Sequence, residues 1–191
     1  MTVHESTLRR FDEACDSVAE LTALLHRAYA EHAAAGRVFL ASYQSERDTA
    51  HRLGKGECWL AVGADGAPLG TVTLSATDRK PQGYPREPGS GSFWQLAVLP
   101  EQRGTGLGNR LLELAERRLA ELGSRRVVID TSSTATELLG WYARRGYRPI
   151  GSYDWAATNY LSTVLRKELQ CAAASQLGPT PTETSSGARS A

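Results

Sequence analysis

The sequence predicts a single-domain α+β protein in which helices pack on one layer of β-sheet. The chain has 191 residues, enough to bury one sizeable core but too few for two comfortable domains. Strand-like and helix-like stretches follow the order β-α-α-β-β-β-α-β-α-β-β, which favours a mixed sheet. Residues 1–5 are expected to be a loose terminus, 6–169 the domain, and 170–191 a disordered tail rich in Ala, Ser, Thr, Pro and Gly.

In the first half of the chain, hydrophobic spacing and turn residues predict the elements. Apolar residues recur at helical spacing after Asp16. Either Asp16 or Ser17 can cap that helix, and Gly36 can end it. Asp65-Gly66 is a hairpin turn between two apolar stretches. The expected elements are a strand at 7–11, helices at 16–36 and 45–53, and antiparallel strands at 57–64 and 68–76. Residues 38–43 are compatible with either a loop or a brief extended segment.

The second half begins with a long loop at 78–91, rich in Pro, Gly and charge, of a kind that is often functional or mobile. Leucines at helical spacing after Leu107, with Glu113 facing Arg117, predict an amphipathic helix. The expected elements are strands at 93–99, 126–130, 147–153 and 161–169, and helices at 107–122 and 134–145.

Composition excludes several classes of function. The net charge is +1, so neither nucleic acid nor an anionic membrane is expected as a partner. No apolar run approaches the roughly 20 residues of a membrane span, and no signal pattern is seen, so a cytoplasmic location is expected. Three separated cysteines indicate neither a disulfide framework nor a zinc site. All four histidines precede residue 52 and no Gly-x-Ser-x-Gly elbow is present, which argues against hydrolase chemistry.

The stretch 96–110 joins an apolar strand to a helix through a glycine-rich loop. The N–H groups of a helix's first turn are unpaired and carry partial positive charge, so such a junction is suited to an anion. The dinucleotide fingerprint would need a glycine at position 109, which is Asn109, and no Gly-Lys-Ser/Thr follows as in a P-loop. The remaining pattern is Arg103-x-x-Gly106-x-Gly108.

This pattern resembles the acyl-coenzyme A loop, Q/R-x-x-G-x-G/A, of the GNAT family of N-acetyltransferases. The residues 95–100 resemble the family's strand before that loop, and 141–147 resemble its aromatic signature near the carboxyl end. The resemblance extends over about residues 6–169 and includes the element order. It implies a three-layer α/β arrangement: a mixed, mostly antiparallel sheet, splayed at its centre, with helices on both faces.

The resemblance also implies a function. The protein would be an acetyl-CoA-dependent N-acetyltransferase that acts on a primary amine of a small molecule or peptide, by direct attack in a ternary complex. Acetyl-CoA would be its co-substrate, and no metal is expected. The alternative is a non-catalytic acyl-CoA-binding or regulatory domain. Both a monomer and a homodimer are compatible with the sequence.

In the family, the loop cradles the pyrophosphate of the co-substrate and the preceding strand binds its pantetheine arm. A backbone N–H near Val98 would polarise the thioester carbonyl as an oxyanion donor does. The residues that the resemblance assigns to the co-substrate are Leu96, Ala97, Val98, Arg103, Gly104, Thr105, Gly106, Leu107, Gly108, Asn109 and Arg110.

Tyr142 matches the family's general acid, which donates a proton to the leaving thiolate, although a packed aromatic is also compatible with its position. Members often carry Asn seven residues earlier, where this chain has Ala135. Glu57 and Asp130, near strand ends, are the candidate bases, and a dedicated base is not required if the amine loses its proton to solvent. Acceptor-binding residues are expected within 37–56 and 78–92 and just beyond. The candidates there are Tyr43, Tyr84 and Trp94, with Phe39, Arg79 and Arg86 beside them.

Overall fold

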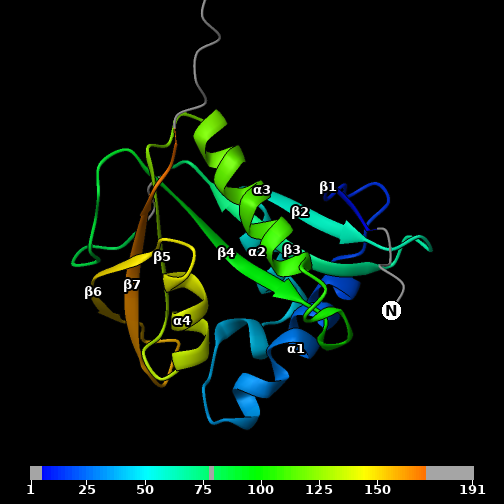
Figure 1. Ribbon diagram of the computed structural model, residues 1–191. Coiled ribbons are helices and arrows are strands. Elements are labelled where there is room, and N and C mark those ends of the chain that lie inside the picture. The colour runs from blue at the N-terminus through cyan, green and yellow to red at the C-terminus, as the bar shows by residue number, and fades with distance from the viewer. Residues whose placement is uncertain (1–5, 78–79, 171–191) are drawn as a thin grey trace, which may run out of the picture.

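Seven strands form one mixed sheet in the order β1-β2-β3-β4-β5-β7-β6 (Figure 1). The computed structural model describes residues 6–77 and 80–170, so the expected loose terminus and all but the first residue of the expected tail lie outside it. The strands are β1 (Thr7–Arg10), β2 (Glu57–Val62), β3 (Pro68–Ser75), β4 (Ser90–Val98), β5 (Arg126–Ser132), β6 (Arg148–Asp154) and β7 (Leu161–Glu168). The order and type of the elements agree with the sequence prediction.

The sheet opens between β4 and β5. This pair is parallel and joined only at Ser90↔Arg126 and Gly91↔Val127, whereas all other neighbours are antiparallel. Beyond Gly91 the two strands diverge, as Figure 1 shows. The expected mixed, mostly antiparallel sheet splayed at its centre is therefore confirmed.

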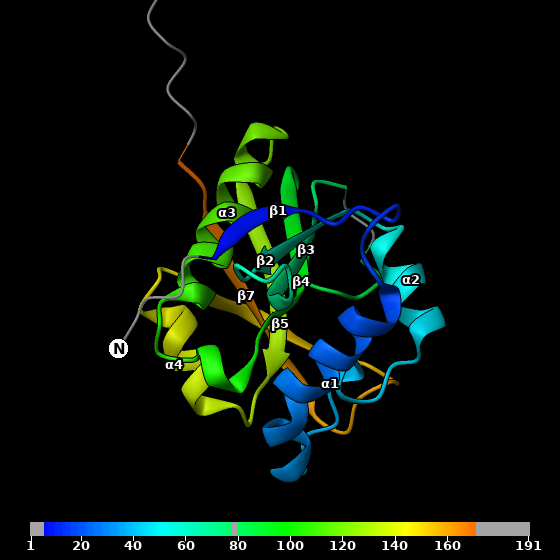
Figure 2. The same cartoon turned by 90° about the vertical axis from the view of Figure 1, so that its right-hand side faces the viewer.

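Four α-helices cover both faces of the sheet. They are α1 (Val18–Ala34), α2 (Glu46–Leu53), α3 (Leu107–Glu121) and α4 (Thr136–Ala143), with short 3-10 turns η1 (Leu40–Ser42) and η2 (Pro100–Gln102). In Figure 2, α3 and α4 lie on one side of the sheet and α1 and α2 on the other. The first two helices begin as their sequences predict, because Ser17 caps α1 and Ser45 forms a capping box with Asp48 at α2.

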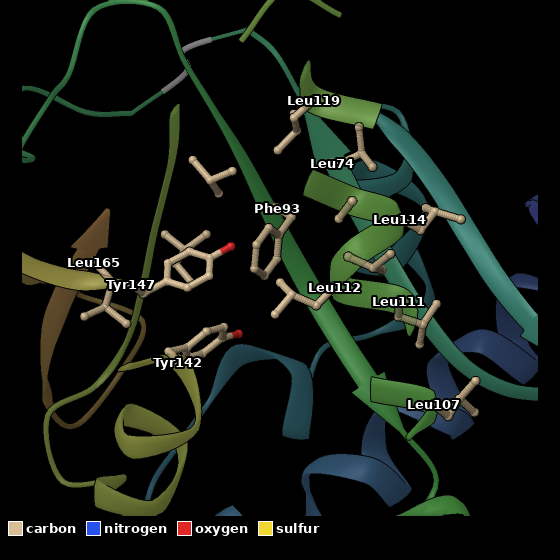
Figure 3. Packing of buried hydrophobic residues seen from close by; sticks show 14 of the residues in the cluster. Leu74, Phe93, Leu107, Leu111, Leu112, Leu114, Leu119, Tyr142, Tyr147 and Leu165 are labelled. Carbon is tan, nitrogen blue, oxygen red and sulfur yellow. The ribbon is translucent and has the colours of Figure 1, made fainter. Parts of the chain in front are cut away.

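Each face has its own apolar core. The leucine stripe of α3 packs with Phe93 of β4 and with two aromatic residues, Tyr142 and Tyr147 (Figure 3). On the opposite face, leucines of α1 pack against β2 and the end of β4. Because side chains alternate along a strand, a β4 residue next to Phe93 faces the α1–α2 side. The two helical layers thus meet different sets of side chains from the same open strand.

Several element boundaries differ from the sequence prediction by a few residues, and β4 is the clearest case. The strand β4 begins at Ser90, inside the expected loop, because its first two residues pair with β5. The segment 38–43, for which the sequence left two alternatives, contains the 3-10 turn η1. In the part of the chain that the structure describes, no helix is long and apolar enough to cross a membrane.

Candidate active site

The strand β4 carries a bulge at Gln95. Thr71 pairs with Ala97 but Thr73 pairs with Trp94, so one residue of β3 faces two of β4. Gln95 has φ of 54°, and it is the one non-glycine residue with positive φ in the described ranges. Such a conformation costs on the order of 1–3 kcal/mol, so the surrounding structure must hold it in place. The bulge turns the backbone of β4 beside the opening in the sheet.

A cavity of about 1190 Å³ follows this opening. One wall is the backbone and side chains of β4, including Leu96, Ala97 and Val98, and the other includes β5 and α4. Because β4 and β5 pair only at their first residues, the edge of β4 that faces β5 is free of strand pairing from residue 92 onwards. Extended backbone at such an edge can hydrogen-bond a ligand in the way another strand would.

The glycine loop closes one end of the cavity. Gly104 and Gly106 adopt φ of 74° and 88°, which side-chain-bearing residues rarely adopt. Gly106 is the N-cap of α3 and offers no capping side chain. In the described chain, the N–H groups of Gly104, Gly106 and Gly108 donate to no backbone carbonyl, and all three glycines line the cavity. The loop therefore presents unpaired donors at the positive end of a helix, as a phosphate group requires.

Several predicted loop residues are engaged with the protein itself. Arg103 lines the cavity, but its guanidinium forms an ion pair with Glu31 and donates to the carbonyl of Ala28 at 2.9 Å, so it anchors the loop to α1. Arg110 points to Ser6, donating to its Oγ at 2.7 Å. Thr105 donates to a backbone carbonyl in its own turn. Neither Arg110 nor Thr105 lines the cavity, whereas Leu107 and Asn109 do.

Arg145 is a loop contact that the sequence analysis missed. Its guanidinium donates to Asn109 Oδ1, with Nε at 2.9 Å, and lies 3.9 Å from the ring centre of Trp141. All three residues line the cavity beside the glycine loop, so a cation stands next to the unpaired N–H groups. The Arg-Arg-Gly run after Tyr142 was the available signal, but spacing alone could not show that this arginine reaches α3.

Tyr142 lies on α4 and lines the cavity, with 6% of its surface exposed. Its ring is 6.4 Å from that of Phe93 and 5.2 Å from that of Tyr147 (Figure 3). No described residue hydrogen-bonds its hydroxyl. Burial raises the pKa of Tyr142 well above its ordinary value, so the phenol stays protonated at neutral pH. The two alternatives that the sequence left open, packed aromatic and proton donor, are both compatible with this position.

Asp130 lies on β5 and lines the cavity. Both of its oxygens already accept hydrogen bonds, from Tyr84 Oη at 2.9 Å and from Trp155 Nε1 at 2.8 Å. The Lys80 ammonium lies 3.6 Å from the same carboxylate. This arrangement ties the loop before β4 and the segment after β6 to β5, and leaves little capacity for accepting a proton from a ligand.

The predicted acceptor residues are separated by the structure. Trp94 lines the cavity, and so do Phe39 and Arg86. Tyr84 is 3% exposed and lies behind the wall, where it holds Asp130. Tyr43 is 50% exposed and donates to the carbonyl of Ala157, outside the cavity lining. Arg79 lies outside the described residues.

Glu57 is also absent from the cavity lining. It forms two hydrogen bonds with Arg118 of α3, at 3.1 Å to Nε and 3.0 Å to Nη2. The Glu57 carboxylate is held by both bonds of the Arg118 guanidinium, away from the opening in the sheet. This pair joins β2 to α3. The sequence could not anticipate this, because the two residues are 61 positions apart.

Replacing Glu57 by Gln is expected to leave turnover unchanged and to lower the free energy of unfolding by about 1 kcal/mol near neutral pH. Arg118 holds the pKa of Glu57 below its ordinary value of 4.5. The stabilisation is therefore present above that value and is lost as the pH falls through the lowered pKa. Urea unfolding of both proteins, at about pH 7 and about pH 2.5, should show a difference that disappears in acid. A large loss of turnover in the Glu57→Gln variant would instead indicate that Glu57 takes part in catalysis.

Together, the open sheet and the glycine loop define the class of protein: an α+β fold whose central cavity runs from the unpaired N–H groups at the start of α3 to the helical layer on the other side of the sheet. Residues 19–147 match the family model described as "Acetyltransferase (GNAT) family". The chain therefore belongs to the GNAT family of acetyltransferases, for which acyl-CoA is the co-substrate.

Solved structures share this fold at low sequence identity. The ribosomal-protein-S18-alanine N-acetyltransferase from Escherichia coli is 14% identical, with a TM-score of 0.66 over 90% of this chain and 99% of that one. The IAA acetyltransferase from Bacillus cereus is 17% identical, with a TM-score of 0.60 over 86% and 100%. A GNAT acetyltransferase from Staphylococcus aureus is 14% identical, with a TM-score of 0.63 over 87% and 100%.

Proposed function

We propose that this protein transfers an acetyl group from acetyl-CoA to the primary amine of a small molecule or peptide, by direct attack in a ternary complex. The observation that carries the proposal is the cavity that crosses the open edge of β4. Its glycine loop and α4 lie on one helical side, and residues of α1, η1 and α2 line it from the other. Two ligands that enter from opposite sides would meet at the bulge.

The chain's own residues fit the co-substrate. The unpaired N–H groups of Gly104, Gly106 and Gly108, with the Arg145 guanidinium beside them, would hold its pyrophosphate. The free edge of β4 at Leu96–Val98 would hold the extended arm, and a backbone N–H near Val98 would polarise the carbonyl. The co-substrate supplies the acyl group already activated as a thioester.

Tyr142 would give its proton to the leaving sulfur. A protonated phenol in the wall of the cavity, hydrogen-bonded by none of the described residues, supports this role. The acceptor would lose its proton to solvent before it attacks, because Glu57 lies away from the cavity and both Asp130 oxygens accept hydrogen bonds from neighbours.

A non-catalytic acyl-CoA-binding or regulatory domain is the second candidate function. Ala135 favours it, because it places no polar side chain at the start of α4, where many members carry Asn. The enzymatic function is preferred, since a binding domain has no use for a tyrosine in the cavity wall whose hydroxyl is bonded by no described residue.

Calorimetric titration with acetyl-CoA, followed by measurement of thiol release with a panel of amines, tests the proposal. We expect binding in the micromolar range typical of enzyme substrates, and release of CoA with at least one class of amine. Binding without release across the panel would favour the regulatory alternative. Absence of binding would contradict both functions.

A further inference from the structure

We infer that Arg52 forms an anion-binding subsite for the acceptor, and that the acceptor is therefore a small amine that also carries a carboxylate, such as a free amino acid. This inference rests on the proposed function and specifies its substrate class. Arg52 lies in the last turn of α2. It lines the cavity from the side of the sheet opposite the glycine loop and α3.

Arg52 is a partly buried cation for which no partner is found among the described residues. Its Nε is buried and has no hydrogen-bond partner, and no ion pair joins its guanidinium to any carboxylate in the described ranges. Burial lowers the pKa of Arg52, yet a guanidinium remains charged at any physiological pH. A buried charge without a partner is costly, so its retention points to a ligand that supplies the missing negative group.

Arg52 lies near the part of the cavity that β4 lines beside its bulge, through its neighbour Tyr29. It lies close enough to Tyr29 for each side chain to affect the pKa of the other, and burial raises the pKa of Tyr29 to about 12. The Tyr29 hydroxyl donates to the carbonyl of Leu96 at 3.2 Å, next to the bulge. A carboxylate bound at Arg52 would thus lie near the strand where the amine must attack, which favours a compact acceptor.

Other buried polar atoms in the residues that line the cavity also lack a hydrogen-bond partner in the described chain, and they too are donors. Of the ten buried side-chain N and O atoms that lack a partner among the described residues, six line this cavity and all six can donate a hydrogen bond. They are Arg52 Nε, Ser90 Oγ, Ser92 Oγ, Trp94 Nε1, Gln95 Nε2 and Thr131 Oγ1. These donors belong to residues that line the same cavity as the Arg52 guanidinium.

A purely structural role for Arg52 is less well supported. A cation in the last turn interacts favourably with the helix dipole, but this effect is small and is equally available to a fully exposed side chain. Asp48 and Asp130 are the carboxylates whose charges act on Arg52. The first is held by the Ser45 capping box, and the second accepts hydrogen bonds from Tyr84 and Trp155, so each has other partners.

The test compares free L-amino acids with their carboxamides, which differ in the anionic group. Calorimetry on the protein saturated with CoA, which has no acetyl group to transfer, measures binding without turnover. Thiol release with acetyl-CoA measures kcat/KM for the same pairs. Wild-type protein is expected to prefer at least one acid over its amide by about 10-fold or more, and Arg52→Gln to abolish that preference. The acid-over-amide preference in kcat/KM is compared between the variant and the wild-type protein. Differences in the intrinsic reactivity of the amines cancel in this comparison.

Three further measurements make the result specific. Arg52→Lys keeps the charge but not the planar fork, so it is expected to restore part of the preference. Arg47→Gln makes the same change on an exposed part of the same helix, outside the cavity, and should leave the preference intact. Arg52→Met is expected to keep or raise the unfolding temperature of the free protein, because it removes an unpaired buried charge. A lowered unfolding temperature would indicate a structural role.

Equal binding of acids and amides, no binding of any acid, or a preference that survives Arg52→Gln would overturn the inference. If amides are acetylated as well as acids, the inference fails while the proposed function stands. If CoA and an acid bind together but no amine releases thiol, the anion subsite is supported and the proposed catalysis fails.

Discussion

Tyr142→Phe is expected to lower kcat by about 10²- to 10⁴-fold, the usual contribution of a general acid. The KM for acetyl-CoA should change little, because the ring that packs against Phe93 and Tyr147 is retained. The unfolding temperature should also be preserved, since the described residues form no hydrogen bond with the hydroxyl that is removed. Steady-state kinetics with the best amine of the panel, together with thermal unfolding, measures these quantities.

Tyr147→Phe is the matched control for this variant. Tyr147 is equally buried, but its hydroxyl donates to Glu116 at 2.9 Å and the residue does not line the cavity. Its loss should lower the free energy of unfolding by about 1 kcal/mol and leave kcat unchanged. The two variants should therefore show opposite patterns. Full turnover by Tyr142→Phe would exclude the proton-donor role and leave Tyr142 as a packed aromatic.

Gly108→Asp is expected to weaken acetyl-CoA binding on the order of 100-fold. A carboxylate about 5 Å from a phosphate repels it by about 3 kcal/mol at an effective dielectric constant of about 20. The same substitution should not destabilise the free protein, because Gly108 is the second residue of α3, where a negative charge is favourable and glycine is a poor helix former. Calorimetric titration should show the weaker affinity for acetyl-CoA, and thermal unfolding should show an unchanged or higher unfolding temperature of the free protein.

Gly108→Ala separates the effect of charge from that of size. A Cβ at this position would lie 3.7 Å from Val98 Cγ2 and 3.9 Å from Trp141 Cζ2, which are ordinary contacts. The alanine variant should bind acetyl-CoA within a few-fold of wild type. The loss caused by aspartate should also diminish at high salt, because screening weakens the repulsion. Equal loss for alanine and aspartate would mean that shape and not charge governs this end of the cavity.

Local sequence signals predicted most of the fold correctly. Ser17, one of the two caps that the sequence allowed, caps α1, and α2 follows Ser45 at the start of the expected helix 45–53. Hydrophobic spacing and turn residues together identified the strands of the sheet and the α-helices. The start of β4 was misplaced because Ser90 and Gly91 have no strand signature of their own, and their pairing with β5 depends on residues more than 30 positions away.

The candidate site was predicted unevenly, for a physical reason. The glycine loop could be recognised because positive φ and exposed backbone N–H groups require glycine at particular positions. Glu57, Tyr43 and Tyr84 were assigned from their place near strands and loops, and the structure gives each a partner elsewhere. A side chain's partner is decided by packing, which a one-dimensional pattern does not contain.

The sequence by itself determined the order of the elements, the glycine-rich loop between strand and helix, and the resemblance to the family. Each of these depends on spacing within about fifteen residues, the range over which helical periodicity, capping and glycine conformations act. Only the tertiary structure decided how β4 separates from β5, which arginines face the cavity, and which of them lack a partner. Arg103 is paired with Glu31 of α1, whereas Arg52 has no ion pair within the described residues, and that difference arises from contacts between segments far apart in the chain.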